Sequence, residues 1–89
     1  MATRTVTIAS SVGLHARPAS MFVQAASDTG LDVEIGRPGE DAVDATSILG
    51  VMALGAKHGE EVVLNAEGEG AEEALDSLVA LLSRDLDAE

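Results

Sequence analysis

His15 and Arg17 have the residue types and the spacing for phosphate chemistry. They stand two positions apart, where a predicted strand gives way to a helix that is expected to begin at Ala16. The N-terminus of a helix offers unpaired N–H groups and a partial positive charge, and therefore binds anions. A neutral imidazole adds a nucleophile, and a guanidinium adds a charge-assisted hydrogen-bond donor. The pattern predicts that His15 takes up a phosphoryl group, which the N–H groups of Ala16 and Arg17 and the Arg17 side chain then hold.

The spacing alone leaves other interpretations open. His15 and Arg17 also fit as surface residues without a function, or as a histidine that only caps a helix. His58, the second histidine, lies in a predicted turn and is interpreted as a solvated loop residue. Ser47 precedes a predicted short helix, so it is either an N-cap or a phosphorylation site, since negative charge is tolerated at a helix start. The two histidines are far apart and cysteine is absent, so no metal site is expected.

The composition excludes several classes of partner and chemistry. Sixteen acidic residues against five basic ones give a formal charge of −11, and Phe22 is the only aromatic residue. Such a chain repels nucleic acid and lacks aromatic faces on which bases stack. The absence of cysteine excludes disulfides and thiol catalysis. No signal peptide and no apolar run of membrane-spanning length is recognised, so we expect a cytoplasmic protein without membrane insertion.

The hydrophobic pattern predicts one α+β domain that spans residues 1–89. Strands are predicted at 2–8, 31–35, 41–45 and 62–66, and helices at 16–29, 47–54 and 71–82. The element order is therefore βαββαβα. Each predicted strand has one apolar face and the longer helices have one apolar stripe, so we expect two layers with the other face of the sheet in solvent.

The short helix carries more apolar residues than one of its faces can bury. These are Ile48, Leu49, Val51, Met52 and Leu54. Some of them should therefore be exposed, which indicates a docking surface. Met21 lies off the apolar stripe of the first helix and is expected to extend this surface.

Two segments together resemble the HPr family, the histidine-containing phosphocarriers of the bacterial phosphoenolpyruvate:sugar phosphotransferase system. The segments are GLHARPAS at 13–20 and SILGVMALG at 47–55. The resemblance implies an open-faced β-sandwich, in which three helices cover one face of a four-stranded antiparallel sheet. It also implies that His15 accepts a phosphoryl group on Nδ1 from enzyme I, charged by phosphoenolpyruvate, and passes it to enzyme II A components for sugar uptake. Arg17 would stabilise the phosphoryl group during transfer.

The resemblance further implies a docking surface and a regulatory site. The docking residues would be Met21, Gln24, Ile48, Leu49 and Met52. Ser47 matches the serine that a kinase and phosphatase modify in many relatives, with a transcription regulator as a further partner. Two departures bear on this: Val12 stands where many members carry Asn or Ser, and residues 44–46 are Asp-Ala-Thr where many regulated members have a lysine just before the serine.

The resemblance defines a component of a transfer chain rather than a free-standing enzyme. It implies no cofactor in this chain and a monomer. Two alternatives remain open at this point. One is a regulatory paralogue in a nitrogen-type phosphotransfer chain or bound to a transcription regulator, and the other is a small protein-binding module without covalent chemistry.

Overall fold

The computed structural model describes residues 2–9, 13 and 16–83. The strands are β1 (Ala2–Thr7), β2 (Asp32–Gly36), β3 (Val43–Asp44) and β4 (Glu61–Glu67), and the helices are α1 (Ala16–Asp28), α2 (Ile48–Leu54) and α3 (Ala71–Leu82). This order along the chain is the predicted βαββαβα.

The four strands form one antiparallel sheet in the spatial order β1-β4-β2-β3. Val6 pairs with Val62, and Ile35 pairs with Leu64. These four side chains are buried, whereas neighbouring residues along the strands, such as Thr5, face solvent. Because successive side chains point to opposite faces, one face of the sheet is apolar and the other is wet.

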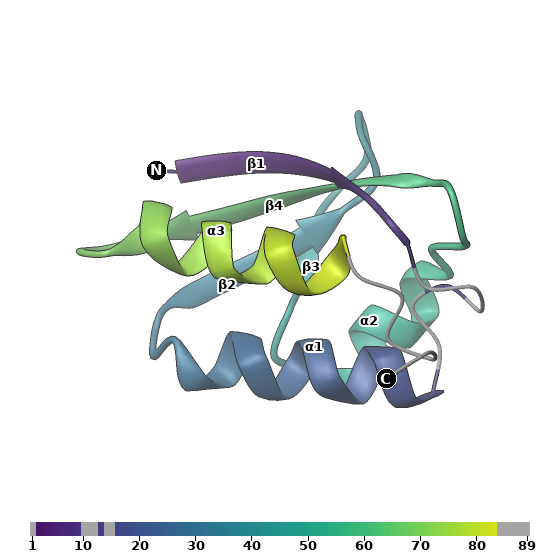
Figure 1. The fold of residues 1–89 in the computed structure, drawn as a ribbon, viewed down its shortest axis with the longest axis horizontal. Coiled ribbons are helices and arrows are strands. Elements are labelled where there is room, and N and C mark those ends of the chain that lie inside the picture. Colours follow the sequence, from purple (N-terminus) through teal and green to yellow (C-terminus); the bar gives the residue numbers. More distant parts are fainter. Residues whose placement is uncertain (1, 10–12, 14–15, 84–89) are drawn as a thin grey trace.

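The helices cover the apolar face, as the resemblance implied (Figure 1). In α3 a stripe of Leu75, Leu78 and Leu82 is buried. In α1 the buried positions include Phe22 and Ala26, with helical spacing. α3 packs on β1 and β4, and α1 contacts both α2 and α3. The predicted open-faced sandwich is therefore confirmed.

Two strands are shorter than the sequence predicts. β1 ends at Thr7 rather than at residue 8, although Ile8 remains buried and its N–H donates to Glu60 O at 2.9 Å. β3 is confined to Val43–Asp44. The Asp44 carboxylate accepts hydrogen bonds from the N–H and the hydroxyl of Thr46, at 2.9 and 2.6 Å. This local turn leads the chain out of the sheet and towards α2.

Polar contacts tie the outer elements to one another. Arg4 on β1 donates to Asp76 on α3 at 3.0 Å and lies 3.5 Å from Glu72. The contacts of Arg4 join the edge strand β1 to α3, the helix that covers it.

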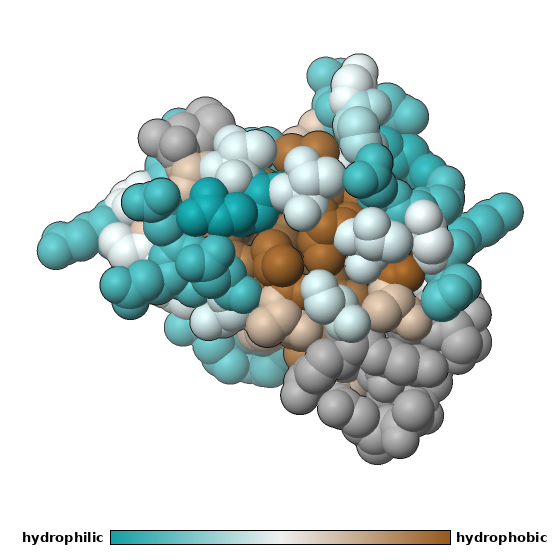
Figure 2. Space-filling model, turned by 45° about the horizontal axis from the view of Figure 1, so that its top comes forward, coloured by the Kyte–Doolittle hydropathy of each residue, from teal (hydrophilic) through white to brown (hydrophobic). Residues whose placement is uncertain are grey.

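Figure 2 shows apolar residues in the middle of one face of the molecule, with hydrophilic residues around them.

Candidate phosphoryl-transfer site

The N-terminus of α1 is where the sequence places phosphate chemistry. The helix begins at Ala16, as predicted, and Pro18 occupies its first turn. A missing N–H costs little there. Arg17 is exposed, while Pro18 and Ala19 are buried. The guanidinium is therefore carried on the solvent side of a helix start that is anchored by its next two residues. His15 and Val12 lie outside the described residues.

Gly13 lies against the loop that follows α2. It is buried, with a φ of +73°. A Cβ at this position would collide with the carbonyl oxygen of Ala56 and would lie 2.8 Å from Cα of Lys57. Only glycine combines this conformation with so close an approach. The segment that leads to His15 thus rests directly on the backbone at residues 56–57.

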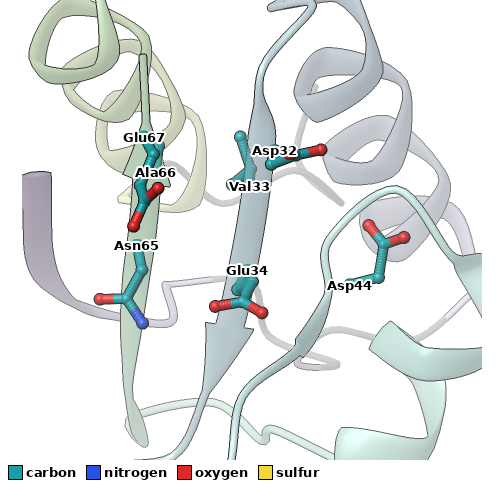
Figure 3. Close-up of a pocket in the computed structure, with 7 residues that line it drawn as sticks. All are labelled: Asp32, Val33, Glu34, Asp44, Asn65, Ala66 and Glu67. Carbon is teal, nitrogen blue, oxygen red and sulfur yellow. The ribbon is translucent and has the colours of Figure 1, made fainter. Parts of the chain in front are cut away.

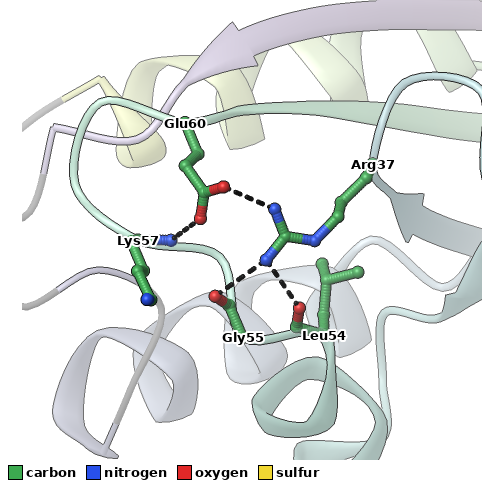
Figure 4. A network of polar contacts seen from close by, with 5 residues as sticks. All are labelled: Arg37, Leu54, Gly55, Lys57 and Glu60. Carbon is green, nitrogen blue, oxygen red and sulfur yellow. Dashed lines mark hydrogen bonds and ion pairs between the residues drawn. The ribbon is translucent and has the colours of Figure 1, made fainter.

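A polar network holds that loop in place (Figure 4). Arg37, just after β2, donates to Glu60 Oε2 at 2.6 Å from Nη1. Its Nη2 donates to the carbonyl oxygens of Leu54 and Gly55, at 3.1 and 3.0 Å. Glu60 Oε1 accepts the N–H of Lys57 at 2.7 Å. The end of α2 and the loop after it are thereby connected to the turn between β2 and β3.

The network also shifts the pKa of its ionisable members. The hydrogen bond from Arg37 holds the pKa of Glu60 below its ordinary value of 4.5, with a further contribution from the Lys57 N–H. The same hydrogen bond raises the pKa of Arg37. Both residues therefore carry their charges at neutral pH.

α2 has the ends that the sequence predicts. The Ser47 hydroxyl oxygen accepts the N–H of Gly50 at 3.2 Å, so Ser47 is the N-cap. Gly55 ends the helix with a φ of 66° and donates its N–H to Met52 O. At least one function of Ser47 is therefore structural.

The expected docking residues are distributed over two helices in contact. Leu49 is 79% exposed and Ile48 is 37% exposed, whereas Val51 is buried. Met21 and Met52 are half-buried, and Gln24 is exposed and donates to Asp28 at 3.0 Å. The expectation that α2 exposes part of its apolar set is confirmed; the docking role itself stays a prediction.

Two other features are the wet face of the sheet and the second histidine. On the wet face of the sheet a hollow of about 370 Å³ is lined by β2, β3 and β4 (Figure 3). Its carboxylates are Asp32, Glu34, Asp44 and Glu67. Such a surface repels phosphate. His58 is exposed in the turn before β4, as predicted.

The sequence pattern does not indicate that Arg37 and Glu60 support the segment before α1. Arg37 lies in a predicted turn, and Glu60 carries no recognisable motif. They are separated by 23 positions, so no local spacing relates them. Their pairing depends on β2 and β4 lying side by side.

Comparison with known proteins agrees with this architecture. The family model described as "PTS HPr component phosphorylation site" matches residues 2–84. The chain is 48% identical over 87 residues to the phosphocarrier protein HPr of Streptomyces coelicolor, covering 98% of this chain and 94% of that protein. It is 53% identical over 81 residues to HPr of Haloferax volcanii, covering 90% and 91%.

Solved structures agree as well. A crystal structure of HPr from Thermoanaerobacter tengcongensis matches with a TM-score of 0.86 and 43% identity, covering 92% of this chain and 91% of that one. Among the residues that the structure describes, no helix has both the length and the apolar character needed to cross a membrane. The sequence motifs, the fold and these similarities lead to one conclusion: the chain belongs to the HPr family of phosphocarrier proteins of the phosphotransferase system.

Proposed function

We propose that this chain accepts a phosphoryl group on His15 Nδ1 from enzyme I and passes it to enzyme II A components. The observation that carries the proposal is the helix start at Ala16, directly after His15, with Arg17 exposed in the first turn. It lies within the segment matched by the family model that describes a phosphorylation site. The cytoplasm is the proposed location, because phosphoenolpyruvate is a cytoplasmic metabolite.

The proposed reaction is an in-line transfer in two steps. In the first, the Nδ1 lone pair of neutral His15 forms a bond to phosphorus, while the bond between phosphorus and its carrier atom on enzyme I breaks. The electron pair of that broken bond stays with enzyme I. In the second, a nucleophile of the enzyme II A component attacks phosphorus, and the electron pair of the P–N bond returns to Nδ1.

Arg17 and the N–H groups of Ala16 and Arg17 would stabilise the charge on the phosphoryl oxygens. Positioning and electrostatic stabilisation supply most of the catalysis in phosphoryl transfer. We expect Arg17→Met to lower the transfer rate by about 100-fold, the order seen when one preorganised donor is removed from a developing oxyanion. Rapid-quench measurements with saturating enzyme I test this.

The direct experiment uses the two histidines as matched variants. Wild type, His15→Ala and His58→Ala are incubated with enzyme I, phosphoenolpyruvate and Mg²⁺, and acid-labile phosphate is measured by ³¹P NMR. Wild type and His58→Ala should gain phosphate on a histidine, and His15→Ala should gain none. Phosphate uptake by His15→Ala, or its loss in His58→Ala alone, would overturn the assignment.

The docking role of the exposed apolar residues is part of the same proposal. A transient complex needs a desolvated apolar contact beside the reacting groups. Leu49, at 79% exposure, is the most exposed large apolar side chain among the described residues. It lies on α2, which contacts the helix that begins beside His15.

A further inference from the structure

Two structural features meet at the loop formed by residues 54–60, and the proposed transfer chemistry uses neither of them. One is the Arg37–Glu60 network, and the other is the close packing of Gly13 on Ala56 and Lys57. Backbone hydrogen bonds also hold this loop: Ile8 N donates to Glu60 O and Gly59 N donates to Ile8 O, both at 2.9 Å, and Glu60 N donates to Lys57 O at 3.0 Å.

Arg37 acts on this loop at both of its ends. Nη2 donates to the carbonyl oxygens of Leu54 and Gly55 at the end of α2, and Nη1 donates to Glu60, the residue directly before β4. The planar guanidinium presents its donors in a fixed fork, so one side chain holds both ends at a set separation. Glu60 then uses its second oxygen to hold the Lys57 N–H.

The backbone so held is the surface on which Gly13 rests. An added Cβ at Gly13 would meet Ala56 O and Lys57 Cα, so there is no spare room between the two segments. Ala56 is itself 4% exposed. A displacement of residues 56–57 therefore either pushes Gly13 or opens a gap beneath it. His15 stands two positions after Gly13 and directly before the first residue of α1, so we expect a displacement at Gly13 to alter the geometry at His15.

We propose that Arg37 and Glu60 are positioning residues for phosphoryl transfer, which hold the 54–60 loop where Gly13 rests on it and so set the placement of His15. The inference rests on the proposed function of His15. Neither residue needs to touch the phosphoryl group. Their effect is to restrict the geometry of the nucleophile, and transfer rates fall steeply when a nucleophile is misplaced.

Arg37→Met tests this, with Arg4→Met as the matched control. Both arginines are partly exposed, both are ion-paired, and both substitutions change the net charge equally. Arg4 joins β1 to α3 and has no contact with the loop in the structure. Arg37→Lys is the conservative variant, because an ammonium group keeps the charge and loses the fork.

Two measurements distinguish positioning from general stability. The first is the rate of phosphoryl uptake by His15 at saturating enzyme I, together with the KM for this chain. We expect Arg37→Met to lower the saturating rate by about 3- to 10-fold with little change in KM, Arg37→Lys to fall in between, and Arg4→Met to stay at the wild-type rate. The second is the NMR titration of the His15 imidazole, whose midpoint and tautomer signals should change in Arg37→Met and not in Arg4→Met.

Glu60→Gln provides a milder second variant, because its amide oxygen still accepts the Lys57 N–H while the ion pair is lost. It should lower the saturating rate in the same direction and by less. If wild type is phosphorylated on His15, and Arg37→Met, Glu60→Gln and Arg4→Met all show equal rates and equal imidazole titrations, the positioning inference is wrong. The proposed function then still stands. An effect on KM with an unchanged saturating rate also overturns it, because that result points to docking. Wild type that gains no phosphate on His15 overturns the proposed function instead.

Discussion

The hydroxyl oxygen of Ser47 accepts the N–H of Gly50 at 3.2 Å and so closes the first turn of α2. This helix has seven residues and no acidic residue in its first turn. A helix this short is marginal in isolation and depends on its ends and its packing. The N-cap therefore supports the helix that presents Leu49 and Ile48 to solvent.

Ser47→Ala should destabilise the protein by about 1 kcal/mol, because the Gly50 N–H loses its partner. Urea unfolding followed by circular dichroism measures this. Ser47→Asn is the matched control, since asparagine caps as well as serine and adds no charge. Equal stabilities of the two variants would contradict a capping role for the hydroxyl.

Gly13→Ala should lower the free energy of unfolding by more than the backbone conformation alone explains. The conformation costs about 1 kcal/mol, and here the new Cβ also collides with Ala56 O. Gly30→Ala is the control, because Gly30 has a φ of +71° and nothing lies within 4 Å of its added Cβ. We expect only Gly13→Ala to slow phosphoryl uptake as well. The prediction fails if both substitutions lower the urea midpoint equally.

Much of this architecture could be predicted because its signals are local. Alternation marks β4, a leucine stripe marks α3, and Ser47 and Gly55 mark the ends of α2. The extent of β3 was not predictable from alternation, since it depends on the Asp44 carboxylate capturing the Thr46 N–H.

The candidate site was predictable in its reacting residues and not in its support. His15 and Arg17 stand close in the sequence and carry a recognisable pattern. The contact between Gly13 and Ala56, and that between Arg37 and Glu60, join segments brought together only by the folded sheet and helices. No local sequence pattern predicts these contacts.

Acid should weaken the Arg37–Glu60 pair in a defined direction. The pKa of Glu60 is lowered on folding from an ordinary value of 4.5, so the folded state binds its proton less readily than the unfolded state. The pair's stabilisation is therefore fully present above about pH 4.5 and is lost as pH falls through the lower folded pKa. The pair is near the surface, so the effect is small.

The measurement is the urea midpoint from neutral pH down to about pH 3, for wild type and Glu60→Gln. The difference between the two proteins should shrink as the pH falls below about 4.5. Taking the difference removes the contributions of the other carboxylates, which protonate in both proteins. A difference that stays constant over this range would show that the charge of Glu60 contributes nothing.

Salt should stabilise this protein, although salt screens its ion pairs. The chain carries sixteen acidic residues and five basic ones, so repulsion among carboxylates outweighs the attraction of pairs such as Arg4–Asp76. Screening removes more repulsion than attraction. Raising NaCl from about 0.02 M to about 0.5 M should therefore raise the urea midpoint. An equal concentration of KCl should act alike, and a falling midpoint would contradict the balance of charges argued here.

Leu49→Asp should separate docking from folding. Leu49 is 79% exposed, and substitutions at such positions usually change stability by no more than about 0.5 kcal/mol. Loss of an apolar anchor from an interface costs more than about 1 kcal/mol of binding free energy, and the acid adds unfavourable charge to an already acidic protein. We therefore expect the KM for phosphoryl uptake from enzyme I to rise by about tenfold with the urea midpoint nearly unchanged. Ala53→Asp, an exposed residue of the same helix, places the same charge without removing a large apolar side chain and should raise the KM less.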